Sequence, residues 1–139
     1  MLIIDTGPLV ALIDKQDKEM HEKCAAIVRE NTGVLHTTIP CLTEAMHFLR
    51  SRRGWKGQAT LWQYVTKRHL VIFPLLYPEL MRVQELMQQY HDTPMSIADA
   101  SLVVLAETQN IHRILTTDSD FFAYRIHGKD SFEVLKPDI

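Results

Sequence analysis

Acidic side chains recur in this sequence at points where an α/β chain ends a strand or begins a helix. Asp5 follows the apolar run 2–4, and Asp118 follows the stretch 113–117, which has the pattern of a short buried strand. In a parallel α/β sheet, strand ends and the starts of the neighbouring helices share one edge, where active sites form. Carboxylates gathered at such an edge repel one another unless a cation binds between them. The candidates are Asp5, Glu44, Asp99 and Asp118, with Asp120 as an additional one.

The chemistry that these carboxylates favour is hydrolysis with a divalent cation. Oxygen ligands without Cys or His favour Mg²⁺ or Mn²⁺ over Zn²⁺. One or two such ions would bind a phosphodiester, activate a water and stabilise the leaving oxygen. The stretch 118–120 lacks the turn glycine and the distal glutamate of an EF-hand loop, and the sequence has no HExxH motif. No Cys or Ser stands beside a plausible base, so a covalent nucleophile is not indicated.

Structural interpretations compete with these functional ones. Ser96 and Asp99 have the spacing of a capping box, in which the acid serves the first turn of a helix. Asp118 after a strand could simply form a turn. Thr6 and Thr117 neighbour the acids and could orient a carboxylate through their hydroxyl groups, although strand packing explains them equally well. The functional interpretation is favoured because several acids are expected at the same edge.

The elements that would position these acids alternate along the chain. Apolar runs predict strands at 2–4, 34–39, 70–73 and 113–117, with a last edge strand at 132–135. Helical periodicity predicts helices at 9–13, 18–30, 40–53, 56–69 and 78–91, and a helix from 97 that is apolar on nearly every face. This alternation predicts an α/β fold with a largely parallel sheet covered by helices, in one domain of residues 1–139.

Composition narrows the class of protein. The net charge of -2 argues against binding of nucleic acid by bulk charge alone, but it leaves room for a local basic patch. Cys24 and Cys41 lack CxxC spacing, which fits a reduced, cytoplasmic protein. The N-terminus has no basic region of a signal peptide, and no apolar run is long enough to span a membrane.

The ordered set of motifs resembles a known family. The chain has Asp5-Thr6 after its first strand, Glu44 early in a helix, Ile97-Ala98-Asp99-Ala100, and Leu115-Thr116-Thr117-Asp118-Ser119-Asp120-Phe121. Together these motifs resemble the PIN domain and, more narrowly, the ribonuclease toxins of bacterial VapBC toxin–antitoxin modules. The resemblance covers almost the whole chain. One departure is Gly7, which stands where many relatives carry Ser or Asn and removes one polar side chain near the expected metal.

The resemblance implies a three-layer α/β/α sandwich and an endoribonuclease that depends on Mg²⁺ or Mn²⁺. It implies that Asp5, Glu44, Asp99 and Asp118 take the catalytic ligand positions, with Asp120 as an additional ligand. It further implies a homodimer, often inhibited by an antitoxin whose tail covers the acidic site. These properties are expectations that the sequence raises about this chain.

Basic and aromatic residues could serve the binding of RNA. Phosphates require positive groups, and the candidates on this chain are Arg50, Arg52, Arg53 and Lys56. The alternative is that these side chains are solvated and satisfy a helix C-terminus. Trp55 and Trp62 could stack on bases, but packing in a dimer face is the favoured interpretation.

Two other functions remain as alternatives. A phosphoacceptor receiver domain also gathers acids at the strand ends of a parallel sheet, although this chain leaves no room for a final helix after residue 139. A catalytically silent PIN-like module that binds RNA or protein is the other alternative. The single Asp-Thr after the first strand also argues against the receiver domain, and the presence of all four acids favours the enzyme over the silent module.

Overall fold

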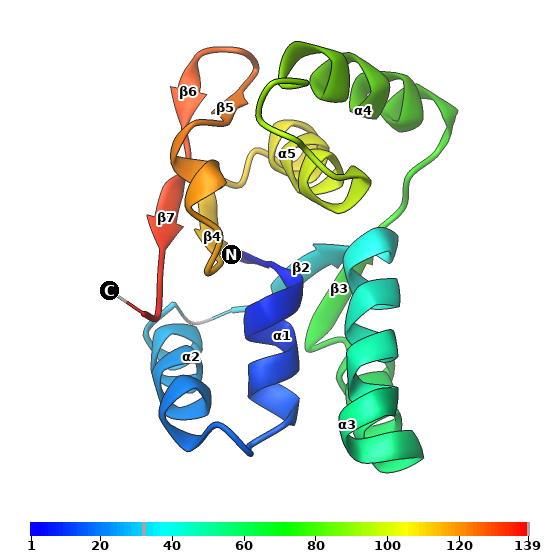
Figure 1. Ribbon diagram of the computed structural model, residues 1–139, viewed down its shortest axis with the longest axis vertical. Coiled ribbons are helices and arrows are strands. Elements are labelled where there is room, and N and C mark those ends of the chain that lie inside the picture. Colours follow the sequence, from blue (N-terminus) through cyan, green and yellow to red (C-terminus); the bar gives the residue numbers. More distant parts are fainter. Residues whose placement is uncertain (32, 139) are drawn as a thin grey trace.

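The central sheet of the protein is parallel and has five strands (Figure 1). The computed structural model describes residues 1–31 and 33–138. The strands lie in the order β3-β2-β1-β4-β7, and every pair of neighbours runs parallel. Their bounds are β1 Leu2–Ile4, β2 Leu35–Thr38, β3 Leu70–Phe73, β4 Arg113–Leu115 and β7 Glu133–Leu135. The predicted parallel sheet and its last edge strand are thereby confirmed.

Helices cover both faces of the sheet, which gives three layers. Alternate residues of β1 point into different cores: Ile3 packs with α4 and α5, whereas Leu2 and Ile4 pack with α1, α2 and α3. Figure 1 shows α4 and α5 on one side of the sheet and α1, α2 and α3 on the other. The helices are α1 Thr6–Ile13, α2 Lys18–Glu30, α3 Ile39–Thr66, α4 Tyr77–Gln89 and α5 Ile97–Gln109. The predicted α/β/α sandwich is confirmed.

The helix that was predicted to be apolar on nearly every face, α5, is buried along most of its length. Eight of its residues, from Ala98 to Ala106, are buried. Its one interior hydroxyl, that of Ser101, donates to Ala98 O at 2.7 Å and shares a hydrogen bond with the Thr38 hydroxyl at 2.6 Å. These bonds satisfy a polar group inside the core, where an unpaired one would cost stability. Asn110, in a left-handed conformation, ends the helix.

The long helix α3 contains the predicted helix 40–53 and most of the predicted helix 56–69, but it ends at Thr66. Gly54 interrupts it, with φ 62° and ψ −150°, a conformation that favours glycine over residues with a side chain. The helix is therefore kinked at Gly54, with helical residues directly before and after the glycine. The expected break at this glycine is present, but no separating loop accompanies it.

A two-stranded hairpin, β5 Arg125–Ile126 and β6 Asp130–Ser131, was not predicted from the sequence. It follows a short 3-10 helix, η1, at Ser119–Phe122. A hydrogen bond anchors the hairpin, because the His127 backbone N–H donates to Glu107 of α5 at 2.7 Å, and Glu107 is itself held by an ion pair with Arg82 of α4. Strands of two residues are too short to produce a recognisable alternation in sequence.

Within the described residues, no helix combines the length and apolarity needed to traverse a lipid bilayer.

Candidate functional site

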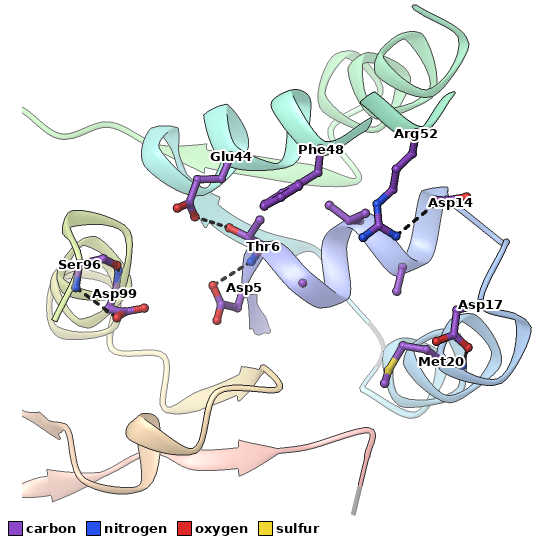
Figure 2. Close-up of a pocket in the computed structure, with 13 residues that line it drawn as sticks. Asp5, Thr6, Asp14, Asp17, Met20, Glu44, Phe48, Arg52, Ser96 and Asp99 are labelled. Atoms are coloured by element: carbon purple, nitrogen blue, oxygen red, sulfur yellow. Dashed lines mark hydrogen bonds and ion pairs between the residues drawn. The ribbon is translucent and has the colours of Figure 1, made fainter. Parts of the chain in front are cut away.

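The predicted acids gather at the carboxyl edge of the sheet. Asp5 directly follows β1, Asp118 follows β4, and Asp99 lies in the first turn of α5. Glu44 lies on α3, just beyond the carboxyl end of β2. Figure 2 shows the side chains of Glu44, Asp5 and Asp99 directed toward a common space. Parallel topology explains the convergence, since every one of these elements begins or ends at the same edge.

Asp5 is the most constrained of these carboxylates. Its Oδ1 accepts from the Thr6 backbone N–H at 2.8 Å, and its Oδ2 accepts from the Thr116 hydroxyl at 2.8 Å. Burial raises the pKa of Asp5, the charges of Asp118 and Glu44 raise it further, and the two hydrogen bonds oppose the rise. Asp5 therefore carries negative charge in a place where that charge is poorly solvated.

Thr6 links two of the acids. Its hydroxyl is buried and donates to Glu44 Oε1 at 2.9 Å, while its backbone N–H serves Asp5. The sequence was equally consistent with an orienting role and with strand packing for Thr6, and its contacts with two carboxylates favour the orienting role. Glu44 itself is exposed, so the hydrogen bond to Thr6 restrains a side chain that would otherwise be free to rotate.

Asp99 is both a helix cap and part of the site. The Asp99 backbone N–H donates to Ser96 Oγ at 3.0 Å, and the Ser96 N–H donates to Asp99 Oδ2 at 3.3 Å, which completes a capping box. The Tyr124 hydroxyl also donates to Oδ2, at 3.4 Å. Burial and the charges of Asp5 and Asp118 raise the pKa of Asp99 to about 6. The structural and the functional interpretations of this residue are therefore compatible.

Asp118 and Asp120 belong to a loop that is held by hydrogen bonds. Asp118 Oδ1 accepts from the Asp120 backbone N–H at 2.9 Å, and the Asp118 N–H donates to the Thr116 hydroxyl at 2.9 Å. Lys136, whose side chain is only 8% exposed, donates through Nζ to Thr117 O at 2.8 Å and to Ser119 Oγ at 3.1 Å. The loop is thus fixed by the residue that follows β7, and Asp118 lies close enough to Asp5 and Asp99 to raise their pKa values.

The orienting threonine of this loop is Thr116, one residue before the predicted Thr117. Thr117 is exposed, and its hydroxyl makes no hydrogen bond with a carboxylate in the part of the chain that the structure describes. Strand β4 ends at Leu115, so the chain turns before the alternation of a strand could place Thr117 inward. Tyr124 and Lys136 were also missed, because both reach the site only through tertiary packing.

A groove of about 450 Å³ extends from the acids along α1. Three predicted acids line it, whereas Asp118 and Asp120 lie outside its lining. Figure 2 shows the groove between α1, α2 and α3, with the acids at one end and Arg52 toward the other. Its lining residues are Asp5, Thr6, Gly7, Val10, Ala11, Asp14, Asp17, Met20, Glu44, Phe48, Arg52, Ser96 and Asp99.

Two of the four predicted basic residues form ion pairs, and the other two are exposed to solvent. Asp14, at the end of α1 and almost fully buried, accepts from Arg53 Nε at 2.8 Å and lies 3.6 Å from Arg52 Nη1. These two arginines lower the pKa of Asp14. Arg50 and Lys56 are exposed on α3. Because α3 continues past Gly54, these side chains do not surround an ordinary helix C-terminus.

The carboxylate oxygens of the site are the kind of ligand that a hard cation prefers, but they are too far apart to enclose one ion by themselves. Within residues 1–31 and 33–138, no three His, Cys, Asp or Glu side chains are grouped closely enough to hold one ion. The carboxylates are nevertheless close enough to raise the pKa values of Asp5 and Asp99. Mg²⁺ commonly binds through one or two carboxylates and keeps several of its waters, so it does not require a closed cage of side chains. The residues therefore fit such an ion with water completing its shell.

Comparisons with known proteins agree with this geometry. The PIN domain family matches residues 2–126 of the chain. No curated protein sequence matches it significantly. The chain is similar in structure to VapC20 of Mycobacterium tuberculosis, a toxin that cleaves the sarcin–ricin loop, with 18% identity and a TM-score of 0.79 over 88% of this chain and 94% of that one.

Two further solved structures are similar to the chain. One is a toxin–antitoxin complex from Klebsiella pneumoniae, with 16% identity and a TM-score of 0.69 over 99% of this chain and 98% of that one. The other is VapBC2 from Rickettsia felis bound to a DNA fragment from its promoter, with 14% identity and a TM-score of 0.65 over 97% of both chains. At these identities the likeness establishes a shared fold.

Proposed function

The chain belongs to the PIN domain family, and on that premise we propose that it is a divalent-metal-dependent endoribonuclease, the toxin of a type II toxin–antitoxin module. The observation that carries the proposal is the convergence of Asp5, Glu44, Asp99 and Asp118 at one edge of the sheet. Family membership also removes the receiver-domain alternative. It leaves the silent binding module as the alternative that experiment must exclude.

The proposed reaction is hydrolysis of an RNA phosphodiester without a covalent intermediate. The four carboxylates would hold Mg²⁺ or Mn²⁺, as one or two ions, and Asp120 would be an additional ligand. When bound, the cation supplies Lewis-acid activation of a water and neutralises charge on the phosphate. Burial raises the pKa of the Cys41 thiol, which lies near Asp5, to about 12, so that thiol cannot serve as a nucleophile at neutral pH.

Side chains behind the carboxylates would keep them in position. Thr116 holds one oxygen of Asp5 and the backbone N–H of Asp118, and Thr6 holds Asp5 and Glu44. Such fixed donors restrict each carboxylate to a narrow range of directions before any cation binds. Preorganisation of this kind lowers the free energy needed to assemble the site when substrate and cation arrive.

RNA would approach across the basic part of α3. Arg50 and Lys56 are exposed and free to meet phosphates, whereas Arg52 and Arg53 would do so while paired with Asp14. The low net charge of the protein makes this local patch, and not the field of the whole molecule, the source of attraction. The enzyme would act in the cytoplasm, where RNA substrates are available.

An antitoxin is the proposed protein partner. Similar structures include a toxin–antitoxin complex and a VapBC pair, and the groove beside the acids is open to a polypeptide tail. A tail that covers Asp5 and Glu44 would exclude RNA from the site. The relevant complex would therefore be inactive until the antitoxin is removed.

We also expect this protein to be a homodimer. Trp55 and Trp62 on α3 are 68% and 44% exposed, and large apolar side chains rarely remain exposed in such number without a partner. Leu61, the neighbour of Trp62 on α3, is fully buried in the core and is not available to such an interface. Sedimentation velocity at micromolar concentration should give a dimer that Trp55→Ser with Trp62→Ser weakens. A monomeric wild-type protein would contradict the proposal.

Cleavage assays with purified protein test the proposed reaction. Structured RNA incubated with the protein and Mn²⁺ should be cut at discrete positions, and EDTA should abolish cutting because the carboxylates then hold no cation. Protein that binds RNA but leaves it intact in Mn²⁺ would indicate the silent module. Cleavage that continues in EDTA would remove the cation from the proposal.

A further inference from the structure

One face of α3 continues the acidic site into the groove. Glu44, Phe48 and Arg52 are spaced by four residues, so they lie on the same side of the helix. All three line the groove, and Figure 2 shows them in sequence above α1, with Glu44 at the acidic end. The two outer residues are about 12 Å apart along the helix axis. An acid, an aromatic ring and a guanidinium thus follow one another along a single wall.

The middle of this wall is an exposed aromatic side chain. Phe48 is 46% exposed, although the neighbouring positions Ala45 and Leu49 of α3 are fully buried. Val10 and Ala11 of α1 also line the groove, as does Met20 of α2, which Figure 2 shows across α1 from Phe48. The Phe48 ring is therefore accessible from the groove. A flat apolar ligand bound against the ring would shield it from water.

The far end of the wall is a guanidinium held from behind. Asp14 lies 3.6 Å from Arg52 Nη1 and also accepts from Arg53 Nε, so the buried carboxylate braces two cations. Asp17, the other acid at this end, accepts from the Met20 backbone N–H as the N-cap of α2. Arg52 remains 55% exposed with donors to spare, and a braced guanidinium loses less conformational freedom when it binds a phosphate.

We propose that this groove is a nucleotide-binding subsite, in which Phe48 stacks on the base next to the scissile phosphate and Arg52 contacts the following phosphate. The inference rests on the proposed ribonuclease function and extends it to the recognition of single-stranded RNA. Unpaired RNA alternates planar bases with anionic phosphates, and it is bound by aromatic rings set among positive groups. The order acid, aromatic ring and guanidinium matches that alternation. If the scissile phosphate lies beside Glu44, the adjacent base would lie beside Phe48, one turn further along α3.

Binding measured without cleavage tests the role of Phe48. A short fluorescein-labelled single-stranded oligoadenylate is titrated with the full chain in EDTA at low salt, and anisotropy gives the Kd. Phe48→Leu keeps an apolar side chain but removes the ring, so it should weaken binding by roughly 5- to 150-fold, the loss of one base–aromatic stack. Phe48→Trp should restore binding. Tyr77→Leu, which removes an exposed aromatic outside the groove, should bind as wild type does.

A coupled change in the RNA separates stacking from a structural effect. An abasic nucleotide is moved through the oligoadenylate one position at a time. At one position the wild-type protein should lose as much affinity as Phe48→Leu loses on intact RNA, and Phe48→Leu should then lose little more. Equal and additive losses at every position would overturn the proposal, because the ring would then act on the protein and not on a base.

Other outcomes also decide the matter. Wild-type affinity in Phe48→Leu, or failure of the wild-type chain to bind oligoadenylate, would overturn the subsite; a polypeptide would then be the better occupant of the groove. Either result would leave the proposed nuclease standing if Mn²⁺-dependent cleavage of RNA persists. Conversely, a base-coupled loss at Phe48 in a protein that never cleaves RNA would support the subsite and reject the nuclease.

Discussion

Asp99→Asn should reduce the rate of RNA cleavage about 10³-fold or more, because several kcal/mol of charge stabilisation are lost and each 1.4 kcal/mol is a factor of ten. Asparagine keeps the size of the side chain and its ability to cap the helix, but it removes the negative charge. The capping bonds with Ser96 should therefore persist while the ability to hold a cation disappears. The measurement is the initial rate of cleavage in Mn²⁺, with circular dichroism to confirm the fold.

A carboxylate in the first turn of another helix supplies the matched control. Glu79 caps α4 by accepting from the Leu76 N–H at 2.9 Å, and it lies outside the groove. Glu79→Gln should therefore cleave RNA at the wild-type rate. If Asp99→Asn also cleaves within a few-fold of wild type, Asp99 is only a helix cap and leaves the catalytic set.

The same substitution should change how stability depends on pH. Burial first, and then Asp5 and Asp118, raise the pKa of Asp99 from 3.8 to about 6, so the folded metal-free protein holds a proton that the unfolded chain releases. Its free energy of unfolding should therefore fall as pH rises from about 4 to about 6, by about 1–2 kcal/mol after allowance for partial exposure. Asp99→Asn should lose this part of the decrease in EDTA, and a remaining decrease of the same sign would come from Asp5, whose pKa burial also raises. The pKa values of Asp14 and Glu107 are lowered instead. Their contribution to the free energy of unfolding is therefore lost as pH falls, mainly below this range.

Asp118→Asn should leave the metal-free protein as stable as wild type or more stable, which is the reverse of what most substitutions do. Its charge raises the pKa values of Asp5 and Asp99, so removing it relieves repulsion. The amide oxygen of asparagine can still accept from the Asp120 N–H, so the loop should keep its shape. The variant therefore isolates the effect of charge from that of structure.

Metal should stabilise the wild-type protein and not this variant. A cation that binds only the folded state adds about 2.7 kcal/mol to the free energy of unfolding at a concentration one hundred times its Kd. Thermal melts of both proteins in EDTA and in Mn²⁺ measure this difference, and Asp118→Asn should lose most of the gain. Asp92→Asn, an exposed acid outside the site, should respond as wild type does. A variant destabilised in EDTA with a full metal response would make Asp118 structural.

Much of the fold was determined by local patterns in the sequence. The run Leu2–Ile4 is a strand buried on both faces, and the nearly all-round apolar pattern after Ser96 is the buried helix α5. The cap and the break were also legible, because the Ser96 hydroxyl acts on a residue three positions further on and Gly54 can adopt a positive φ. Periodicity and capping depend on neighbours in sequence, which is why they could be predicted without the tertiary structure.

The gathering of acids also followed from the sequence, because parallel topology sends every strand end to one edge. Asp5 and Asp118 are far apart in the chain but follow the paired strands β1 and β4. The identity of their supporting residues did not follow. Thr116, and not Thr117, holds Asp5, since β4 ends before the alternation of a strand could be extended.

Only the tertiary structure decided what lies around the acids. Arg53 meets Asp14 across 39 positions of sequence, and Tyr124 reaches Asp99 across 25. Phe48 belongs to a groove only because α1 packs against both α3 and α2. Such contacts depend on how helices settle against a sheet, where many weak packing energies act together and no short pattern records the result.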